Sequence, residues 1–423
     1  MAKRTYRTVE VKDVVVEWLS AALSEGRVVF GVDVAKEKFV GAFMNAERVV
    51  MQTVRWKSPG QLGELVALLD AVGGPSRLEV ALEPSGTYGD CLLGRLRSAG
   101  YRVFKVSPKR SHDAAEVYDG VPSKHDAKDA AIIAKLHLDG MSQPWTVASE
   151  RQRNLAAAVE MHDVHQQQYQ RNLGRLEAKL AACWPELPGL LKLTSATLLV
   201  VLSEFGCPEQ VRAAPKRALE VLKTGRSYLT PEKRAAVVES ARHTIGVEMT
   251  AGEQAGLRQL AQEANRNRLA VQAAEKAVEE LVAGDADVLR MAAAVGQVTA
   301  ATIVIGLGNA ADYDSAAAYV KAAGLNLKER SSGKHQGQLK ITKRGPGLVR
   351  RNLYLAVLRL VQHEPHFQAW HAAKVQRMAG VHKIRSVVAL MRKLLGALWH
   401  VGRGAQFEAA RLFDAHKLGL VPA

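Results

Sequence analysis

The chain has 423 residues, 48% of them hydrophobic and 24% charged, which is an ordinary globular composition with room for two or three domains. Its 58 lysines and arginines against 42 aspartates and glutamates give a net charge of +16, which favours a polyanionic partner such as nucleic acid. No apolar run reaches the length of a membrane span, and acidic residues interrupt the basic N-terminal segment, so neither membrane insertion nor a signal peptide is predicted.

Residues 28–145 alternate between strand-like and helix-like segments, after an expected helical extension at 1–27. Three β-rich runs between Val28 and Trp56 are separated by only a few residues, as in an antiparallel meander. A helical pattern, a strand "RLEVALEP", a helix, a strand "YRVFKVS" and the helix "DAKDAAIIAKLHL" follow. This order, βββαβαβα, resembles the α/β ribonuclease H-like fold, a mixed sheet flanked by helices, although other α/β folds share it.

Residues 150–283 are expected to form a coiled-coil hairpin with a helical insert at 184–252 that is punctuated by prolines. Each arm carries a seam of residues spaced alternately by four and three, which pairs either within the chain or with another subunit. Polar seam residues such as His162 and Asn267 are interpreted as fixing the register rather than as metal ligands. The seam residues are Leu155, Val159, His162, Gln166, Tyr169, Leu173, Leu176, Leu180 and Cys183, then Leu257, Leu260, Ala264, Asn267, Val271, Ala274, Val278 and Leu281.

A mostly α-helical domain is expected at 288–403, followed by a tail at 404–423. Two apolar helical stretches surround a glycine turn in "VLRMAAAVGQVTAATIVIGLGN". Between Lys321 and Arg359 there are ten lysines or arginines and one acidic residue, Glu329. This run is the strongest local candidate for a surface that contacts a phosphate backbone, and a solvated basic face is the alternative.

Four carboxylates fall on elements that a ribonuclease H-like sheet brings together. Asp33 ends the first strand, and Glu83 ends the fourth, which lies beside the first in such a sheet. Asp126 and Asp129 are three residues apart and share one face of a helix. Singly, each is better interpreted as a turn or capping acid. As a set they suit two Mg²⁺ ions, which prefer oxygen ligands and stabilise both oxygens of a phosphoryl transfer.

The blocks "GVDVAKEKF", "ALEPSGTYGD" and "KHDAKDAAIIA" resemble the Asp, Glu, Asp, Asp (DEDD) motif of the insertion-sequence-110 family of transposases, whose N-terminal domain is RuvC-like. The segment "AGLNLKERSSGKHQGQLKITKRGPGLVRRNLYLAVL" is similar to the C-terminal transposase domain of that family. The resemblance implies a recombinase that acts on double-stranded DNA, directed by a structured, element-encoded bridge RNA. It also implies a homo-oligomer, a dimer or tetramer, in the bacterial cytoplasm.

Carried over to this sequence, the resemblance implies that the acidic quartet binds Mg²⁺ and that a serine attacks the scissile phosphate. The serine is Ser332, which immediately precedes Gly333 as in the family, and Ser331 is the alternative register. The loop lacks the proline often found before this serine in the family. The proposed ligands are Asp33, Glu83, Asp126 and Asp129, and the basic contacts, assigned from charge and proximity, are Arg330, Lys334, Lys343 and Arg344.

Two other functions remain open at this point. A metal-dependent nuclease resembling a Holliday-junction resolvase would use the quartet to activate water, with Ser332 contacting only phosphate. A non-catalytic nucleic-acid-binding protein would use the carboxylates structurally and the coiled coil for assembly. The three cysteines, Cys91, Cys183 and Cys207, are too far apart for a C-x-x-C zinc site and favour a reducing compartment.

Overall fold

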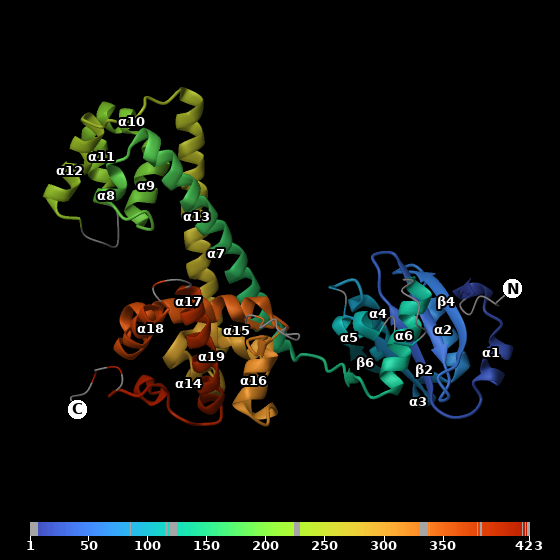
Figure 1. Cartoon of the computed structure of the whole chain (residues 1–423). Coiled ribbons are helices and arrows are strands. Elements are labelled where there is room, and N and C mark those ends of the chain that lie inside the picture. The colour runs from blue at the N-terminus through green and yellow to red at the C-terminus, as the bar shows by residue number, and fades with distance from the viewer. Residues whose placement is uncertain are drawn as a thin grey trace. The chain divides into compact units, whose positions relative to one another are not determined.

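The computed structural model of the chain describes residues 7–84, 86–114, 117–118, 125–223, 229–329, 337, 339–378, 380, 383–416, 418 and 420. The chain divides into two compact units, unit 1 at Met1–Val147 and unit 2 at Ala148–Ala423 (Figure 1). Among the described residues, no helix is both long and apolar enough to cross a bilayer.

The described residues of unit 1 build a seven-stranded mixed sheet with the order β1-β4-β3-β2-β5-β6-β7. Strands β2, β3 and β4 form the expected antiparallel meander, and β5 and β6 continue the sheet parallel to β2. The strands are β1 (Thr8–Glu10), β2 (Val28–Asp33), β3 (Lys38–Met44), β4 (Val50–Lys57), β5 (Leu78–Leu82), β6 (Arg102–Val106) and β7 (Ser142–Pro144).

Helices cover both faces of this sheet. On one face, the apolar side chains of β2 and β5 pack with α1, α2 and α4 around Phe30 and Trp56. On the other face, α6 buries small and branched residues against β2, β3 and β5. The helices of unit 1 are η1 (Val11–Asp13), α1 (Val16–Ala22), α2 (Leu62–Val72), α3 (Gly74–Arg77), α4 (Asp90–Ser98), α5 (Pro108–Ala114) and α6 (Asp126–Leu138). The unit is therefore the ribonuclease H-like mixed sheet that the element order predicts.

Two short edge strands differ from the sequence prediction. The expected helical extension at 1–27 contains η1 and α1, but it also contains β1, which pairs in parallel with β4 and extends the sheet. After α6, where the sequence analysis places no further strand, β7 pairs antiparallel with β6. Each strand has only three residues, too few to carry the alternation of apolar and polar residues by which strands are recognised in a sequence.

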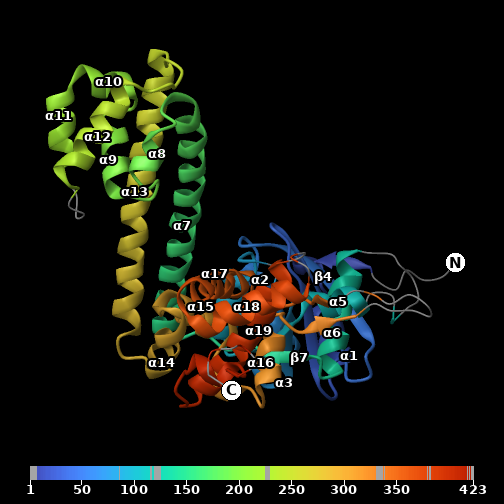
Figure 2. The same ribbon diagram turned by 60° about the vertical axis from the view of Figure 1, so that its left-hand side comes forward.

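Unit 2 is organised around two long helices, α7 (Glu150–Cys183) and α13 (Ala251–Val282), which lie side by side and antiparallel in Figures 1 and 2. Ser149 and Thr250 begin them with capping boxes, in which each side chain accepts a hydrogen bond from the backbone three residues later. Arg151 Nη2, at the start of α7, donates to the carbonyl oxygen of Leu281 at 3.2 Å. The first turn of α7 therefore meets the last turn of α13.

Each end of this helix pair carries a helical lobe with its own core. The segment between α7 and α13 folds beside one end, where it packs around Trp184 and Leu202. The C-terminal helices pack around the other end, where Leu155 and Val278 join their core. The helices of the first lobe are α8 (Leu187–Leu190), α9 (Ala196–Phe205), α10 (Pro208–Ala213), α11 (Pro215–Val221) and α12 (Pro231–Arg242).

The C-terminal lobe is helical apart from one short hairpin, β8 (Leu327–Lys328) with β9 (Lys340–Ile341). Helices α14 and α15 meet at Gly296, whose φ of +83° lies in the left-handed region that favours glycine. This is the glycine turn expected from the sequence. The remaining elements are α14 (Ala286–Val295), α15 (Gln297–Leu307), η2 (Ala310–Asp312), α16 (Ala316–Ala322), α17 (Gly347–His363), α18 (Pro365–Arg377), α19 (Lys383–Gly402) and η3 (Ala409–Leu412).

Candidate active site

The carboxyl ends of β2 and β5 bring two of the predicted acids to one edge of the sheet. These strands are parallel neighbours, and their last registered pair is Val32 with Leu82. Asp33 is the residue after Val32, and Glu83 is the residue after Leu82, so both stand one position beyond that pair. The adjacency of the first and fourth strands that the sequence analysis assumed is therefore confirmed.

Both acids also belong to the side of the sheet that α6 covers. Val29 in β2 and Ala81 in β5 are buried in the cluster formed with α6. Side chains two residues apart on a strand point to the same face. The alternation from Val29 and from Ala81 therefore puts Asp33 and Glu83 on the α6 face at the end of their strands.

Gly31 lets α6 approach this face closely. A Cβ atom at Gly31 would lie 2.6 Å from the backbone nitrogen of Ala134 and closer still to the carbonyl oxygen of Ala130. The last turn of α6 lies over the start of β5, where His137 Nε2 is 3.1 Å from Glu79 Oε2. The opposite end of α6 must then point toward the carboxyl ends of the strands, and that end carries Asp126 and Asp129.

The first turn of α6 is held by groups that the sequence analysis did not single out. His125 is the N-cap residue, and its Nδ1 accepts a hydrogen bond from the backbone nitrogen of Lys128 at 3.2 Å. Lys128 is only 2% exposed, an unusual state for a lysine, and its positive charge stands in the same turn as the two aspartates. Ser111 of α5 donates a hydrogen bond to the Glu83 carboxylate. The bond from Ser111 to Glu83 joins separate segments, so no local sequence motif signals it.

A buried polar network anchors the other end of α6. Glu79 is 4% exposed and pairs with Arg27 and with Arg102, whose Nη2 lies 3.1 Å from Glu79 Oε1. Burial acts to raise the pKa of Glu79, but the hydrogen bonds from His137 and Arg27 lower it overall. Burial lowers the pKa of His137. The network fixes the last turn of α6 on the sheet and thereby the orientation of its first turn.

Asp33, Glu83, Asp126 and Asp129 together form the acidic edge of unit 1. Their oxygen donors and the positions of their backbones suit a divalent cation. Oxygen donors are those that Mg²⁺ prefers, and four acids come from three elements at one end of one face. Within the described part of the chain, however, no three His, Cys, Asp or Glu side chains come close enough together to hold a metal ion. The backbone thus assembles the four residues at one edge, while their carboxylate groups are not gathered around a single point.

The structure describes two of the four predicted basic contacts and neither candidate serine. Arg330, Lys334, Ser331 and Ser332 lie outside the described residues. Lys343 and Arg344 are exposed on the loop that follows β9. That loop is tied down by the bond from Lys343 N to the carbonyl oxygen of Gly324 at 2.8 Å. The two cations are therefore displayed to solvent by a loop with a defined backbone.

Other arginines of the basic run have structural partners. Arg350 Nη1 donates to the carbonyl oxygens of Ala323 at 3.1 Å and Gly345 at 2.7 Å. Arg351 Nη1 lies 2.5 Å from Asp163 Oδ1 and so connects α17 to α7. The charge count between Lys321 and Arg359 therefore overstates the number of cations available to a phosphate backbone.

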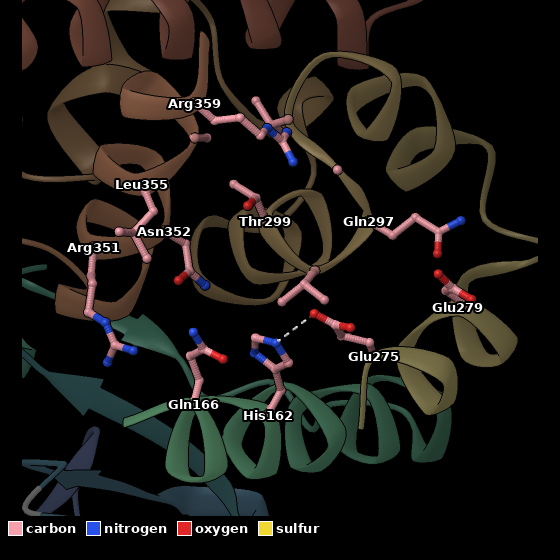
Figure 3. A pocket seen from close by; sticks show the side chains of 14 residues that line it. His162, Gln166, Glu275, Glu279, Gln297, Thr299, Arg351, Asn352, Leu355 and Arg359 are labelled. Carbon is pink, nitrogen blue, oxygen red and sulfur yellow. Dashed lines mark ion pairs between the residues drawn. The ribbon is translucent and has the colours of Figure 1, made fainter. Parts of the chain in front are cut away.

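A cleft of about 440 Å³ opens between α7, α13, α15 and α17 in unit 2 (Figure 3). His162 Nε2 lies 3.6 Å from Glu275 Oε1 across it, and Glu279 lines it nearby. Arg359 lies on the opposite side, with its guanidinium against Gly296. Acidic and basic groups are mixed in this cleft, so its charge does not select one class of ligand.

Comparison with known families gives two matches in the chain. The model of the DEDD transposases of IS110 elements matches residues 30–185, which include the whole acidic edge and α7. The model described as "Transposase IS116/IS110/IS902 family" matches residues 286–372, from α14 into α18. Together they cover more than half of the chain.

Two relatives are similar over most of their length. The 42 kDa protein of insertion element IS900 from Mycobacterium paratuberculosis is 25% identical over 387 residues, which cover 87% of this chain and 94% of the relative. The 43.6 kDa protein of insertion element IS110 from Streptomyces coelicolor is 22% identical over 341 residues, which cover 79% of this chain and 84% of the relative. Both are described as uncharacterized proteins of insertion elements.

Proposed function

Because the chain belongs to the IS110 family of transposases, enzymes that cleave and rejoin DNA, we propose that it excises and inserts an insertion sequence through a serine nucleophile. The observation that carries the proposal is the acidic edge of unit 1, within the region that matches the DEDD transposases. Membership of an enzyme family sets aside the non-catalytic alternative.

In this proposal, Asp33, Glu83, Asp126 and Asp129 hold Mg²⁺, in the form of two ions. The metal would stabilise negative charge that develops on the phosphate. Lys128 lowers the net negative charge of the site from within the first turn of α6. The bond from Ser111 holds the Glu83 carboxylate at the edge of the sheet.

The serine step follows from the chemistry of phosphoryl transfer. The Ser332 Oγ attacks the scissile phosphorus and loses its proton. An Oγ–P bond forms, the bond from phosphorus to the leaving strand breaks, and the departing oxygen gains a proton. The phosphoserine link keeps the energy of the phosphodiester, so rejoining requires no nucleotide cofactor. Ser332 is proposed from the sequence resemblance alone, and Ser331 is the alternative.

The remaining partners follow the same resemblance. We propose a structured guide RNA and double-stranded DNA as ligands, with Arg330, Lys334, Lys343 and Arg344 contacting phosphates in the bacterial cytoplasm. The α7–α13 pair would act as a coiled coil in a homodimer or homotetramer. The domains would then be a catalytic domain at 28–145, a coiled-coil hairpin at 150–283 and a transposase domain at 288–403.

The test is an adduct assay with the wild type and Ser332→Ala. Each protein is incubated with RNA, labelled DNA and Mg²⁺, then denatured and examined for labelled protein. We expect the variant to bind DNA and RNA normally but to give no adduct and no recombinants. If Ser332 only contacted phosphate, the change would remove one hydrogen bond worth about 0.5–1.5 kcal/mol, a roughly tenfold effect at most.

Two outcomes would contradict the proposal. Wild-type levels of adduct from Ser332→Ala would exclude Ser332 as the nucleophile and transfer the role to Ser331, for which the same assay with Ser331→Ala is the check. Free DNA ends without any adduct from the wild type would favour a metal-dependent nuclease, in which water is the nucleophile.

A further inference from the structure

The middle of the α7–α13 pair is polar and incompletely packed. The buried side chains of α7 stop at Val159 and resume at Tyr169, and those of α13 stop at Ala264 and resume at Val271. Over this stretch the two helices run between the lobes of unit 2 in Figures 1 and 2. From the sequence, the polar seam residues are interpreted as fixing the register of the two helices. A surface hollow lies at one end of this stretch, where Arg266 and Asn267 of α13 face Gln168 to Arg175 of α7.

This hollow, of about 410 Å³, gathers three arginines from the two helices. Arg171 and Arg175 are four residues apart on α7 and lie on one face, about 6 Å apart along its axis. Arg266 faces them from α13. The other lining residues are Gln168, Asn172, Glu263 and Asn267.

This arginine hollow has a net positive charge, because three arginines and only one acid line it. Among the described residues, none of the three guanidinium groups forms a hydrogen bond or an ion pair. The one lining acid, Glu263, accepts a hydrogen bond from Gln259 Nε2 at 3.3 Å, and its single negative charge offsets only one of the three positive charges. Like charges at this spacing repel one another and destabilise the helices that carry them. An anion that binds all three would relieve the repulsion.

The cleft in Figure 3 is a useful contrast, because it lies on the same helix pair. There Arg351 is already paired with Asp163, and the two acids Glu275 and Glu279 line the cleft together with Arg359. The mixed charges of that cleft give an anion no net attraction, whereas the arginine hollow is lined by more positive than negative groups. The two hollows have similar volumes, so their charge rather than their size separates them.

We propose that the arginine hollow, formed by Arg171, Arg175 and Arg266, binds the phosphodiester backbone of a nucleic acid. Guanidinium groups bind phosphate oxygens in bidentate fashion, and amides such as Gln168 and Asn267 donate further hydrogen bonds to backbone oxygens. The proposal rests on the activity of the family on DNA and is independent of the serine nucleophile. The helix pair is thereby a binding surface as well as a connector.

The experiment measures the affinity of the full-length protein for a labelled duplex DNA and, separately, for a labelled stem-loop RNA, as a function of salt. The test variant is Arg171→Ala, Arg175→Ala and Arg266→Ala combined. We expect at least a tenfold loss of affinity and a flattening of the log affinity against log salt plot by about two to three units, because each lost phosphate contact removes about one released counterion.

A matched control removes the same number of positive charges elsewhere in unit 2. Arg242, Lys276 and Arg290 are exposed and each pairs with an acid three or four residues away on its own helix. Their combined change to Ala should leave the salt slope nearly as in the wild type. Replacement of the three hollow arginines by Lys should keep most of the slope while weakening binding, because charge remains and the bidentate geometry is lost.

The two probes identify the source of the phosphate. If the test variant loses affinity only for duplex DNA, the hollow binds DNA, and if it loses affinity only for the stem-loop, the hollow binds RNA. If it loses affinity for both probes, the hollow binds the phosphodiester backbone that they share. Equal slopes for the test variant and the control, for both probes, would overturn the proposal. Thermal melting shows whether each variant is folded, and the adduct assay with Ser332→Ala fails or succeeds independently of this result.

Discussion

The acidic edge of unit 1 and the basic surfaces of unit 2 show two ways in which a protein positions charge. At the acidic edge, Gly31, Ser111 and Glu79 place α6 and Glu83 through buried or close contacts. On unit 2, Lys343, Arg344 and the arginine hollow stand in solvent on exposed surfaces. Chemistry on a phosphate needs fixed geometry, whereas binding of a polyanion needs mainly charge density. Changes at the acidic edge should therefore have abrupt effects, and changes on unit 2 graded ones.

The largest effect is expected from Asp126→Asn. Loss of one proposed ligand should reduce strand exchange at least about 100-fold, while leaving nucleic-acid binding nearly unchanged. Asp90→Asn is the matched control, because Asp90 is the first residue of α4 as Asp126 is of α6, on the other face of the same sheet. Exchange and binding are measured on the same preparations. Undiminished exchange by Asp126→Asn would remove this residue from the proposed metal site.

The second change, Gly31→Ala, tests whether the close approach of α6 is required. The added Cβ would meet backbone atoms of α6, so we expect a loss of about 1–3 kcal/mol in the free energy of unfolding of unit 1 and a drop in strand exchange. Gly94→Ala in α4 meets nothing within 4 Å and should be neutral or slightly stabilising. Denaturant unfolding compares them, and equal stabilities would show that α6 tolerates displacement.

A smaller effect is expected from acidification, through the network around Glu79. The pKa values of His137 and Glu79 are both lowered in the folded protein from ordinary values of 6.5 and 4.5. The unfolded chain therefore binds more protons, so stability is fully present above these values and is lost as the pH falls through the lowered ones. Melting temperature should decline first below pH 6.5, through His137, and further below pH 4.5, through Glu79.

The variant Glu79→Gln tests whether the network around Glu79, rather than other acids of unit 1, causes the loss of stability in acid. The variant should melt at a lower temperature near neutral pH, because Arg27 and Arg102 lose a charged partner, and it should show a shallower decline in acid. Glu239→Gln on the exposed surface of α12 is the control. An acid decline as steep as that of the wild type would place the responsible groups elsewhere.

The smallest effect is expected from Lys343→Ala combined with Arg344→Ala. Both side chains are exposed, so folding should be unaffected and the salt dependence of binding should flatten by about one unit per lost contact. Arg242→Ala with Arg290→Ala removes the same charge from sites that already have acid partners. Identical slopes of log affinity against log salt for the two double variants would show that the loop after β9 does not contact phosphates.

The order of elements in unit 1 was predictable because local patterns encode it. Short runs of β-branched and other apolar residues mark β2 to β4, and Ser-Pro and Gly-Gly frame the segment that contains α2. That order implied the adjacency of β2 and β5, and with it the common edge for Asp33 and Glu83. The three-residue strands β1 and β7 were missed, because their pairing depends on a neighbouring strand and not on their own sequence.

The sequence by itself determined the family, the element that carries each acid and the excess of positive charge. Only the tertiary structure decided which charges are engaged. It paired Arg351 with Asp163 and Arg350 with two carbonyl groups, buried Lys128 beside the aspartates, and left Arg171, Arg175 and Arg266 together around a hollow. The physical reason is that periodicity within one element specifies its apolar face, whereas the partner of a charge depends on which distant element packs against it.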